Sequence, residues 1–154
     1  MRNKEEYLEK ARNYAFLLLK FRLRSEEELY QRLKRKNFEE PIIGETLAFL
    51  KERNFIDDEA FARAWIATRL KRPLGLRRIR QELRIKGVAK EIIDTQFREI
   101  KKDYPEEEIV RQLAKTKLDK MKDMDPRTAR RRLMAYLLRR GFPPDVITDV
   151  MSQV

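Results

Sequence analysis

The sequence predicts an all-α protein of three tandem three-helix repeats, and two observations support this fold class. One apolar spacing occurs three times, at offsets of fifty and fifty-four residues. Its copies are Leu29, Leu33, Phe38, Ile42, Ile43 and Leu47; Ile79, Leu83, Val88, Ile92, Ile93 and Phe97; and Leu133, Leu137, Phe142, Val146, Ile147 and Met151. The runs between glycines and prolines are rich in strong helix formers. A fixed period of this size marks units that bury their apolar faces partly against their neighbours.

Each repeat is expected to contain three helices. The repeats are expected to span residues 1–56, 57–104 and 105–154. The first helices are predicted at Glu5–Phe21, Asp58–Leu70 and Glu106–Met121. The middle helices are predicted to begin at Ser25, Pro73 and Asp125, and the third helices near Glu39, Ala89 and Pro143.

Local signals mark both ends of the middle helices. Ser25 and Glu28 form a capping box, in which each side chain accepts a hydrogen bond from a backbone N–H of the other residue. Asp125 and Pro126 place a carboxylate at the N-cap and a proline where no N–H is needed. The residues that end these helices are Asn37, Gly87 and Gly141, which suit a left-handed C′ position. The hydrophobic residue after each is expected to fold back onto the preceding turn.

The composition limits the possible functions. Lys and Arg number 37 against 26 Asp and Glu, a net charge of +11, which favours a polyanionic partner. A heavily charged helical surface without any ligand would give similar totals, so the distribution has to decide. The chain has no cysteine and no histidine, which excludes disulfides and thiolate sites and makes an enzyme the weakest interpretation. No cofactor is expected.

The longest stretch without a charged residue is Asn13–Leu19, and these seven residues are too few to span a bilayer. The N-terminus also lacks the apolar run of a signal peptide. We therefore expect a cytoplasmic protein without membrane contact.

The positive charge is concentrated in the middle of the chain. Residues 63–90 contain ten basic side chains and a single acid, Glu82. On a helix, Arg77, Arg80 and Arg84 fall within about 60° of one another, beside an apolar stripe. Such a row suits phosphate or carboxylate, because each guanidinium can donate two parallel hydrogen bonds. The alternative is a solvated helix face. A second cluster without acids consists of Arg127, Arg130, Arg131, Arg132, Arg139 and Arg140.

Two other features admit two interpretations each. Asp57 and Asp58 are a carboxylate pair that could ligate a divalent metal, but they precede a predicted helix, and N-capping is the favoured explanation. Trp65 lies one turn from Phe61 and is favoured as a core residue over a platform for base stacking.

Taken together, these segments resemble the RecX family of bacterial recombinase regulators over nearly the whole chain. The matching runs are Arg24–Leu33, Lys36–Phe38, Leu50–Ala62, Gly75–Val88 and Leu137–Phe142. Gly75–Val88 resembles the family's central motif, although Leu74 and Leu76 stand where the family usually has an aromatic residue and a proline. The resemblance implies an elongated, curved array of three-helix repeats that lies along the groove of the RecA–DNA filament.

The resemblance also implies a function. Family members block filament growth, promote disassembly, and inhibit the ATPase, strand-exchange and coprotease activities of RecA in DNA repair and the SOS response. The expected partners are the RecA filament and the backbone of single- and double-stranded DNA, and the chain is expected to be a monomer. The residues expected to contact them are Lys71, Arg72, Arg77, Arg78, Arg80, Arg84 and Lys86, followed by Arg131, Arg132, Arg139 and Arg140. The alternatives are a helix-turn-helix DNA-binding protein and a protein-interaction scaffold whose charge confers only solubility.

Overall fold

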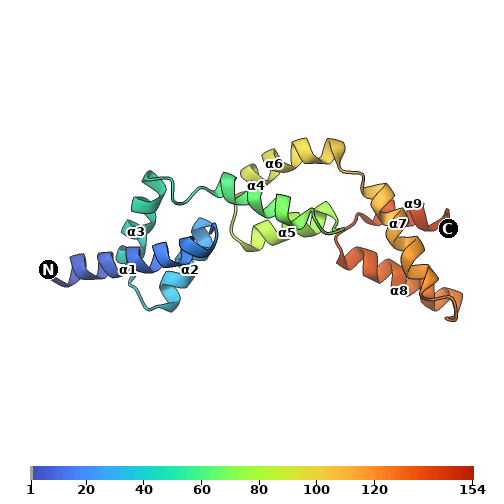
Figure 1. The fold of residues 1–154 in the computed structure, drawn as a ribbon, viewed down its shortest axis with the longest axis horizontal. Coiled ribbons are helices and arrows are strands. Elements are labelled where there is room, and N and C mark those ends of the chain that lie inside the picture. The colour runs from blue at the N-terminus through green and yellow to red at the C-terminus, as the bar shows by residue number, and fades with distance from the viewer. Residues whose placement is uncertain (1) are drawn as a thin grey trace. The chain divides into compact units, whose positions relative to one another are not determined.

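A computed structural model describes residues 2–154, and this part of the chain contains nine α-helices and no β-strand (Figure 1). They are α1 (Arg2–Phe21), α2 (Glu26–Arg35), α3 (Glu40–Glu52), α4 (Asp58–Arg69), α5 (Leu76–Ile85), α6 (Lys90–Asp103), α7 (Glu106–Asp119), α8 (Pro126–Arg139) and α9 (Pro144–Met151). The predicted all-α fold of three tandem three-helix repeats is confirmed. The elongated, curved arrangement of the repeats stays a prediction.

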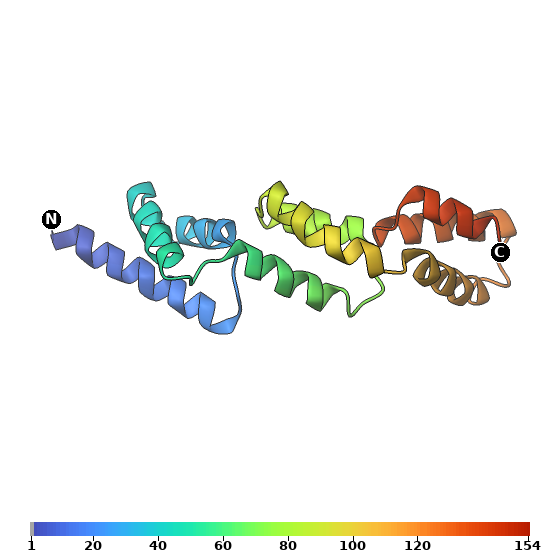
Figure 2. The ribbon, with the colours of Figure 1, turned by 90° about the horizontal axis from the view of Figure 1, so that it is seen from above.

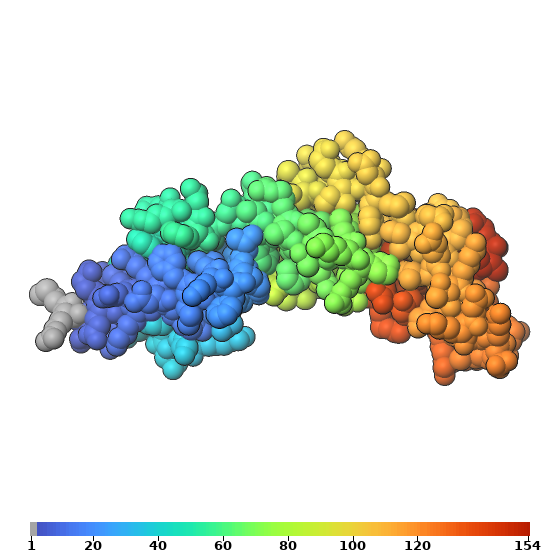
Figure 3. All heavy atoms as spheres, viewed as in Figure 1, coloured from blue at the N-terminus to red at the C-terminus, as the bar shows by residue number. Residues whose placement is uncertain are grey.

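The helices belong to two compact units. The N-terminal unit runs up to Trp65 and also includes Leu83–Gln96, and the C-terminal unit consists of Ile66–Glu82 and Phe97–Val154. The first repeat therefore lies wholly in the N-terminal unit and the third wholly in the C-terminal unit. Within the N-terminal unit, α1, α2 and α3 pack together (Figure 2), and the side chains of α1 lie directly against those of α3 (Figure 3).

The repeated apolar positions are core positions. Nine equivalent residues, three from each copy, are at most 1% exposed: Leu29, Leu33, Ile43, Ile79, Leu83, Ile93, Leu133, Leu137 and Ile147. In the first repeat, Leu29, Leu33 and Ile43 share one core with apolar residues of α1. Leu133, Leu137 and Ile147 do the same with α7 in the third repeat. No described helix is long and apolar enough to cross a membrane.

The predicted helix caps are present. The Ser25 hydroxyl accepts a hydrogen bond from the Glu28 amide at 3.1 Å, and the Glu28 carboxylate accepts one from the Ser25 amide at 3.1 Å. The Asp125 carboxylate accepts one from the Thr128 amide at 3.2 Å. These bonds satisfy N–H groups that have no partner within the helix.

The predicted ends of the middle helices are also confirmed. Asn37, Gly87 and Gly141 have φ angles of 68°, 78° and 92°. The amides of Phe38, Val88 and Phe142 then donate to the carbonyls of Leu33, Leu83 and Leu137 at 3.3, 3.1 and 3.3 Å. At each of these three sites the backbone therefore reverses over the last turn of the helix, and an apolar side chain returns to the core.

The paired aspartates cap two different helices. Asp57 accepts hydrogen bonds from the amides of Glu59 and Ala60, both at 3.1 Å, so it caps α4 as expected. Asp58 instead accepts one from the Glu26 amide at 3.0 Å, at the first turn of α2. Its burial raises the pKa of the Asp58 carboxyl. Across residues 2–154 no group of three or more His, Cys, Asp or Glu could hold a metal ion.

Gly75 lies at a close contact between two loops of the C-terminal unit. Its amide donates to the Arg140 carbonyl at 2.8 Å, and a Cβ added to it would lie 2.1 Å from the Gly141 carbonyl carbon. The neighbouring residues Leu74 and Leu76 are 2% and 7% exposed. Both leucine side chains are therefore buried beside this contact.

Candidate polyanion-binding surface

Two arginines of α5 are exposed and form no ion pair with a described residue. The apolar residues Ile79 and Leu83 of this helix are fully buried and anchor it, whereas Arg77 and Arg84 are exposed. Among the described residues, neither guanidinium forms an ion pair. Lys71 and Arg72, in the link before α5, are also exposed, and neither forms an ion pair with a described residue. These four side chains can donate hydrogen bonds to an external anion without breaking an ion pair among the described residues, although the charge of Arg77 also attracts the Glu106 carboxylate.

Two other arginines of α5 already have partners in the C-terminal unit. The Arg78 Nε lies 3.6 Å from a Glu82 carboxylate oxygen, and its Nη1 donates to the Arg139 carbonyl at 3.5 Å. Arg80 is half-buried, with its guanidinium carbon 5.0 Å from the centroid of the Phe97 ring. Glu82 also binds Arg69 through two hydrogen bonds of 2.9 and 2.7 Å. The single acid of this segment therefore neutralises part of its positive charge.

Lys86 is engaged in the N-terminal unit. Its Nζ lies 2.9 Å from a Glu28 carboxylate oxygen and 5.0 Å from the centroid of the Trp65 ring. Burial by itself would raise the pKa of Glu28, but hydrogen bonds from Arg22, Lys86 and the Ser25 amide lower it to about 2. Trp65 is half-buried and stacks on Phe61 at a centroid distance of 6.0 Å, which favours the packing role expected for it.

In the third repeat, the helix α8 carries the second predicted cluster. Arg131, Arg132 and Arg139 are exposed and form no ion pair within residues 2–154. Arg140 is half-buried, with its guanidinium carbon 5.1 Å from the centroid of the Tyr136 ring. Arg130 donates to the Met151 carbonyl at 3.1 Å and so stabilises the end of α9.

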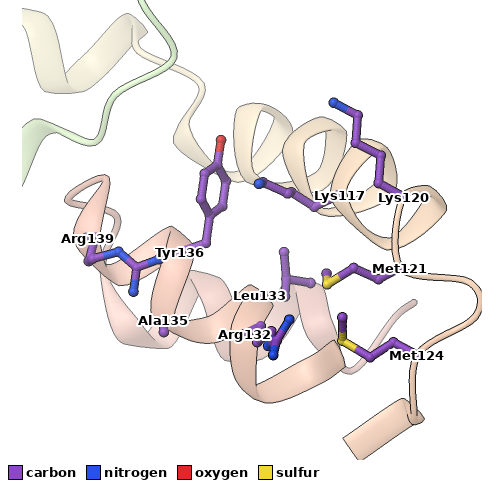
Figure 4. Close-up of a pocket in the computed structure, with 9 residues that line it drawn as sticks. All are labelled: Lys117, Lys120, Met121, Met124, Arg132, Leu133, Ala135, Tyr136 and Arg139. Carbon is purple, nitrogen blue, oxygen red and sulfur yellow. The ribbon is translucent and has the colours of Figure 1, made fainter. Parts of the chain in front are cut away.

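Arg132 and Arg139 also line a cleft of about 490 Å³ between α7 and α8 (Figure 4). Lys117 and Lys120 line the same cleft and were not predicted to contact a ligand. The apolar part of the lining consists of Met121, Met124, Leu133 and Tyr136. The sequence shows the basic cluster of α8 but not this cleft, because the other cations of the lining, Lys117 and Lys120, come from α7 and the loop that follows it.

A second basic hollow, of about 350 Å³, lies in the N-terminal unit. Its cations include Arg22, Arg24, Arg35 and Lys86. The Nε atom of Arg24 is buried and has no hydrogen-bond partner, and burial followed by repulsion from Arg22 lowers the pKa of this guanidinium. Glu28 sits among these cations and balances part of their charge.

Known proteins of one family share this arrangement. Models of the first, second and third three-helix domains of RecX match residues 11–50, 57–95 and 105–151. The regulatory protein RecX of Amycolatopsis mediterranei is 33% identical over 150 residues, which cover 97% of this chain and 85% of the relative. That of Haemophilus influenzae (strain PittEE) is 33% identical over 142 residues, covering 92% of each chain.

The fold is also found in solved structures. The crystal structure of RecX from Lactobacillus salivarius superimposes with a TM-score of 0.80 at 22% identity, covering 97% of both chains. A second crystal structure of a regulatory protein RecX gives a TM-score of 0.80 at 24% identity, covering 96% of this chain and 74% of that one. With three domain models matched in order and relatives aligned along nearly its full length, the chain belongs to the RecX family of regulatory proteins.

Proposed function

We propose that this protein is a non-enzymatic regulator of the RecA recombinase. It binds in the groove of the RecA–DNA filament, blocks extension or promotes disassembly, and thereby inhibits the ATPase, strand-exchange and coprotease activities of RecA. The observation that carries the proposal is the match of all three repeats, in order, to the domains of RecX. It acts as a cytoplasmic monomer without a cofactor, through repeats that span residues 1–56, 57–104 and 105–154.

The basic side chains supply the contacts with DNA backbone and filament protein. The residues assigned to this surface are Lys71, Arg72, Arg77, Arg78, Arg80, Arg84, Lys86, Arg131, Arg132, Arg139 and Arg140. Exposure and the absence of an ion pair with any described residue support the assignment most strongly for Arg77, Arg84 and Arg132. Contacts to phosphate are largely independent of DNA sequence and weaken as salt rises, because each neutralised phosphate releases counterions.

The test replaces arginines of α5 and measures inhibition of the DNA-dependent ATPase of RecA. The variant Arg77→Glu/Arg84→Glu reverses two exposed charges and leaves the packing of Arg80 on Phe97 intact. We expect this variant, and the triple variant that adds Arg80→Glu, to lose inhibition. The matched control is Lys10→Glu/Lys20→Glu, which makes the same charge change on exposed positions of α1.

Circular dichroism and urea denaturation verify that each variant is folded. Full inhibition by the folded double variant would contradict the assignment of α5. If the wild-type protein protects a particular duplex sequence and has no effect on RecA, the helix-turn-helix alternative is correct instead.

A further inference from the structure

The cleft between α7 and α8 combines positive walls with an apolar floor. We infer that it is a docking site for an acidic segment of a protein partner, in which an apolar side chain lies between carboxylates. The inference deepens the proposed function, on which it rests for the identity of the partner, because it names the kind of protein segment that the third repeat binds. Its chemistry follows from the lining alone.

The walls of the cleft carry charge that the protein does not neutralise. No carboxylate of residues 2–154 lines the cleft. Lys120, Arg132 and Arg139 form no ion pair with any described residue. By contrast, Arg111, two turns earlier on α7, binds Glu107 at 2.8 Å and Glu108 at 2.9 Å. The three glutamates of α7 all lie in its first turn, and Asp119, the acid at its C-terminal end, is not among the residues that line the cleft. Carboxylates of a partner would supply the missing countercharge.

The floor of the cleft selects for an apolar group. Met121 and Met124 are half-buried, and Figure 4 shows their side chains pointing toward Leu133. Methionine side chains are flexible and polarisable, and they adapt to apolar partners of varied shape. A purely charged ligand would leave this floor facing water, whereas an apolar side chain between carboxylates would cover it.

The aromatic ring of the cleft argues for a peptide and against nucleic acid. Single-stranded nucleic acid is held by stacking its bases on exposed aromatic faces. The only ring in the lining belongs to Tyr136, and it already has the Lys117 ammonium 4.3 Å and the Arg140 guanidinium 5.1 Å from its centroid. The remaining floor is aliphatic or thioether, which packs against apolar side chains but offers no platform for a base.

The test measures binding of a labelled acidic peptide with a central leucine–phenylalanine pair, by fluorescence anisotropy at physiological salt. Arg132→Glu is expected to weaken binding by about tenfold or more, because it places a negative charge against the peptide carboxylates. Met124→Gln is expected to weaken it by about fivefold without changing the charge, since apolar contact is lost. Met124 is suitable because it is not among the residues packed on the core of this repeat.

Two controls separate this site from general charge attraction. Lys115→Glu makes the same charge change as Arg132→Glu on an exposed position of α7 outside the cleft, and binding should stay within about twofold of wild type. A second peptide keeps the acidic residues but has serines in place of the apolar pair, and it should bind much more weakly. Equal binding of the two peptides, or equal losses in Lys115→Glu and Arg132→Glu, would overturn the inference.

The same proteins are then tested for inhibition of the RecA ATPase, which separates the two proposals. If wild type inhibits RecA but binds neither peptide, the docking site is wrong and the proposed function stands. If wild type binds the apolar acidic peptide but leaves RecA unaffected, the docking site stands and the proposed function is wrong. Binding of labelled oligo(dT) to wild type that the unlabelled peptide competes away and that Arg132→Glu abolishes would identify a nucleic-acid site and overturn the inference.

Discussion

Replacing Glu28 by glutamine should remove much of the pH dependence of stability between pH 5 and pH 2. Glu28 binds Arg22 and Lys86, and its side chain is only 13% exposed. These partners lower its pKa from the usual 4.5 to about 2, in spite of burial. Because the pKa is lower in the folded state, the ionised carboxylate contributes stability above pH 4.5, and this contribution disappears as the pH falls through about 2.

The size of the effect follows from that displacement. At about 1.4 kcal/mol for each pH unit, the displacement corresponds to about 3 kcal/mol. Arg22 is 39% exposed, so water screens part of its attraction to Glu28. We therefore expect Glu28→Gln to lower the free energy of unfolding by about 2–3 kcal/mol at pH 7. At pH 2 the wild type and the variant should differ by less than about 0.5 kcal/mol, because wild-type Glu28 is then about half protonated in the folded state and most of its contribution is lost.

The assay is urea denaturation followed by circular dichroism at several pH values. Other acids also contribute to the pH dependence of stability, including Asp58, whose pKa is raised by burial. The measured quantity is therefore the difference between wild type and variant, in which those contributions cancel. Glu27→Gln is the control, since the Glu27 carboxylate accepts a hydrogen bond from Gln31 and should change stability little at any pH. A difference between wild type and Glu28→Gln that stays constant from pH 7 to pH 2 would refute the reasoning.

Three further predictions concern the glycine contact, the serine cap and salt. Gly75→Ala should lower the free energy of unfolding by about 1–3 kcal/mol, because the added Cβ would meet the Gly141 backbone. Gly44→Ala should raise the free energy of unfolding by about 0.5–1 kcal/mol, because the space around Gly44 is open and alanine favours the helix. Thermal denaturation of both variants tests this difference. Ser25→Ala should cost about 1–2 kcal/mol in urea denaturation, because the hydroxyl caps α2 and also donates to the Lys86 carbonyl at 2.7 Å. Binding to oligo(dT) should weaken with salt, and the double reversal on α5 should lower the log–log slope by about 1.4; an unchanged slope would exclude those arginines from phosphate contact.

The features that the sequence predicted well are local ones. Helix type, the capping box at Ser25 and the left-handed residue at Gly141 depend on residues within one or two turns of each other. The apolar repeat extends this to the core, because equivalent positions such as Leu33 and Leu137 must be buried in the same way. The differences between the predicted and observed helices lie at their ends; α7, for example, ends at Asp119 rather than at the predicted Met121.

Contacts between distant segments could not be predicted. Asp58 caps a helix that begins 32 residues earlier, and Lys86 binds a glutamate 58 residues away. The sequence places Gly75 near the predicted start of a middle helix, but it does not show that the Gly141 loop leaves no room for a side chain there. Each of these depends on which loops and helix ends become neighbours after packing, and the spacing of apolar residues does not specify that.

The difference between counting charges and locating their partners bears directly on function. The sequence places the largest basic excess in residues 63–90, but there Arg78 and Lys86 are held by Glu82 and Glu28. The third repeat has a smaller basic excess, since residues 113–140 contain ten basic and three acidic side chains, yet Arg132 and Arg139 have no acid partner in the described chain. An anion that binds Arg78 or Lys86 must compete with a carboxylate of the protein. An anion that binds Arg132 meets no such competition from a described residue. Cations without an internal partner are therefore the stronger candidates for binding, and they occur in both the second and the third repeats.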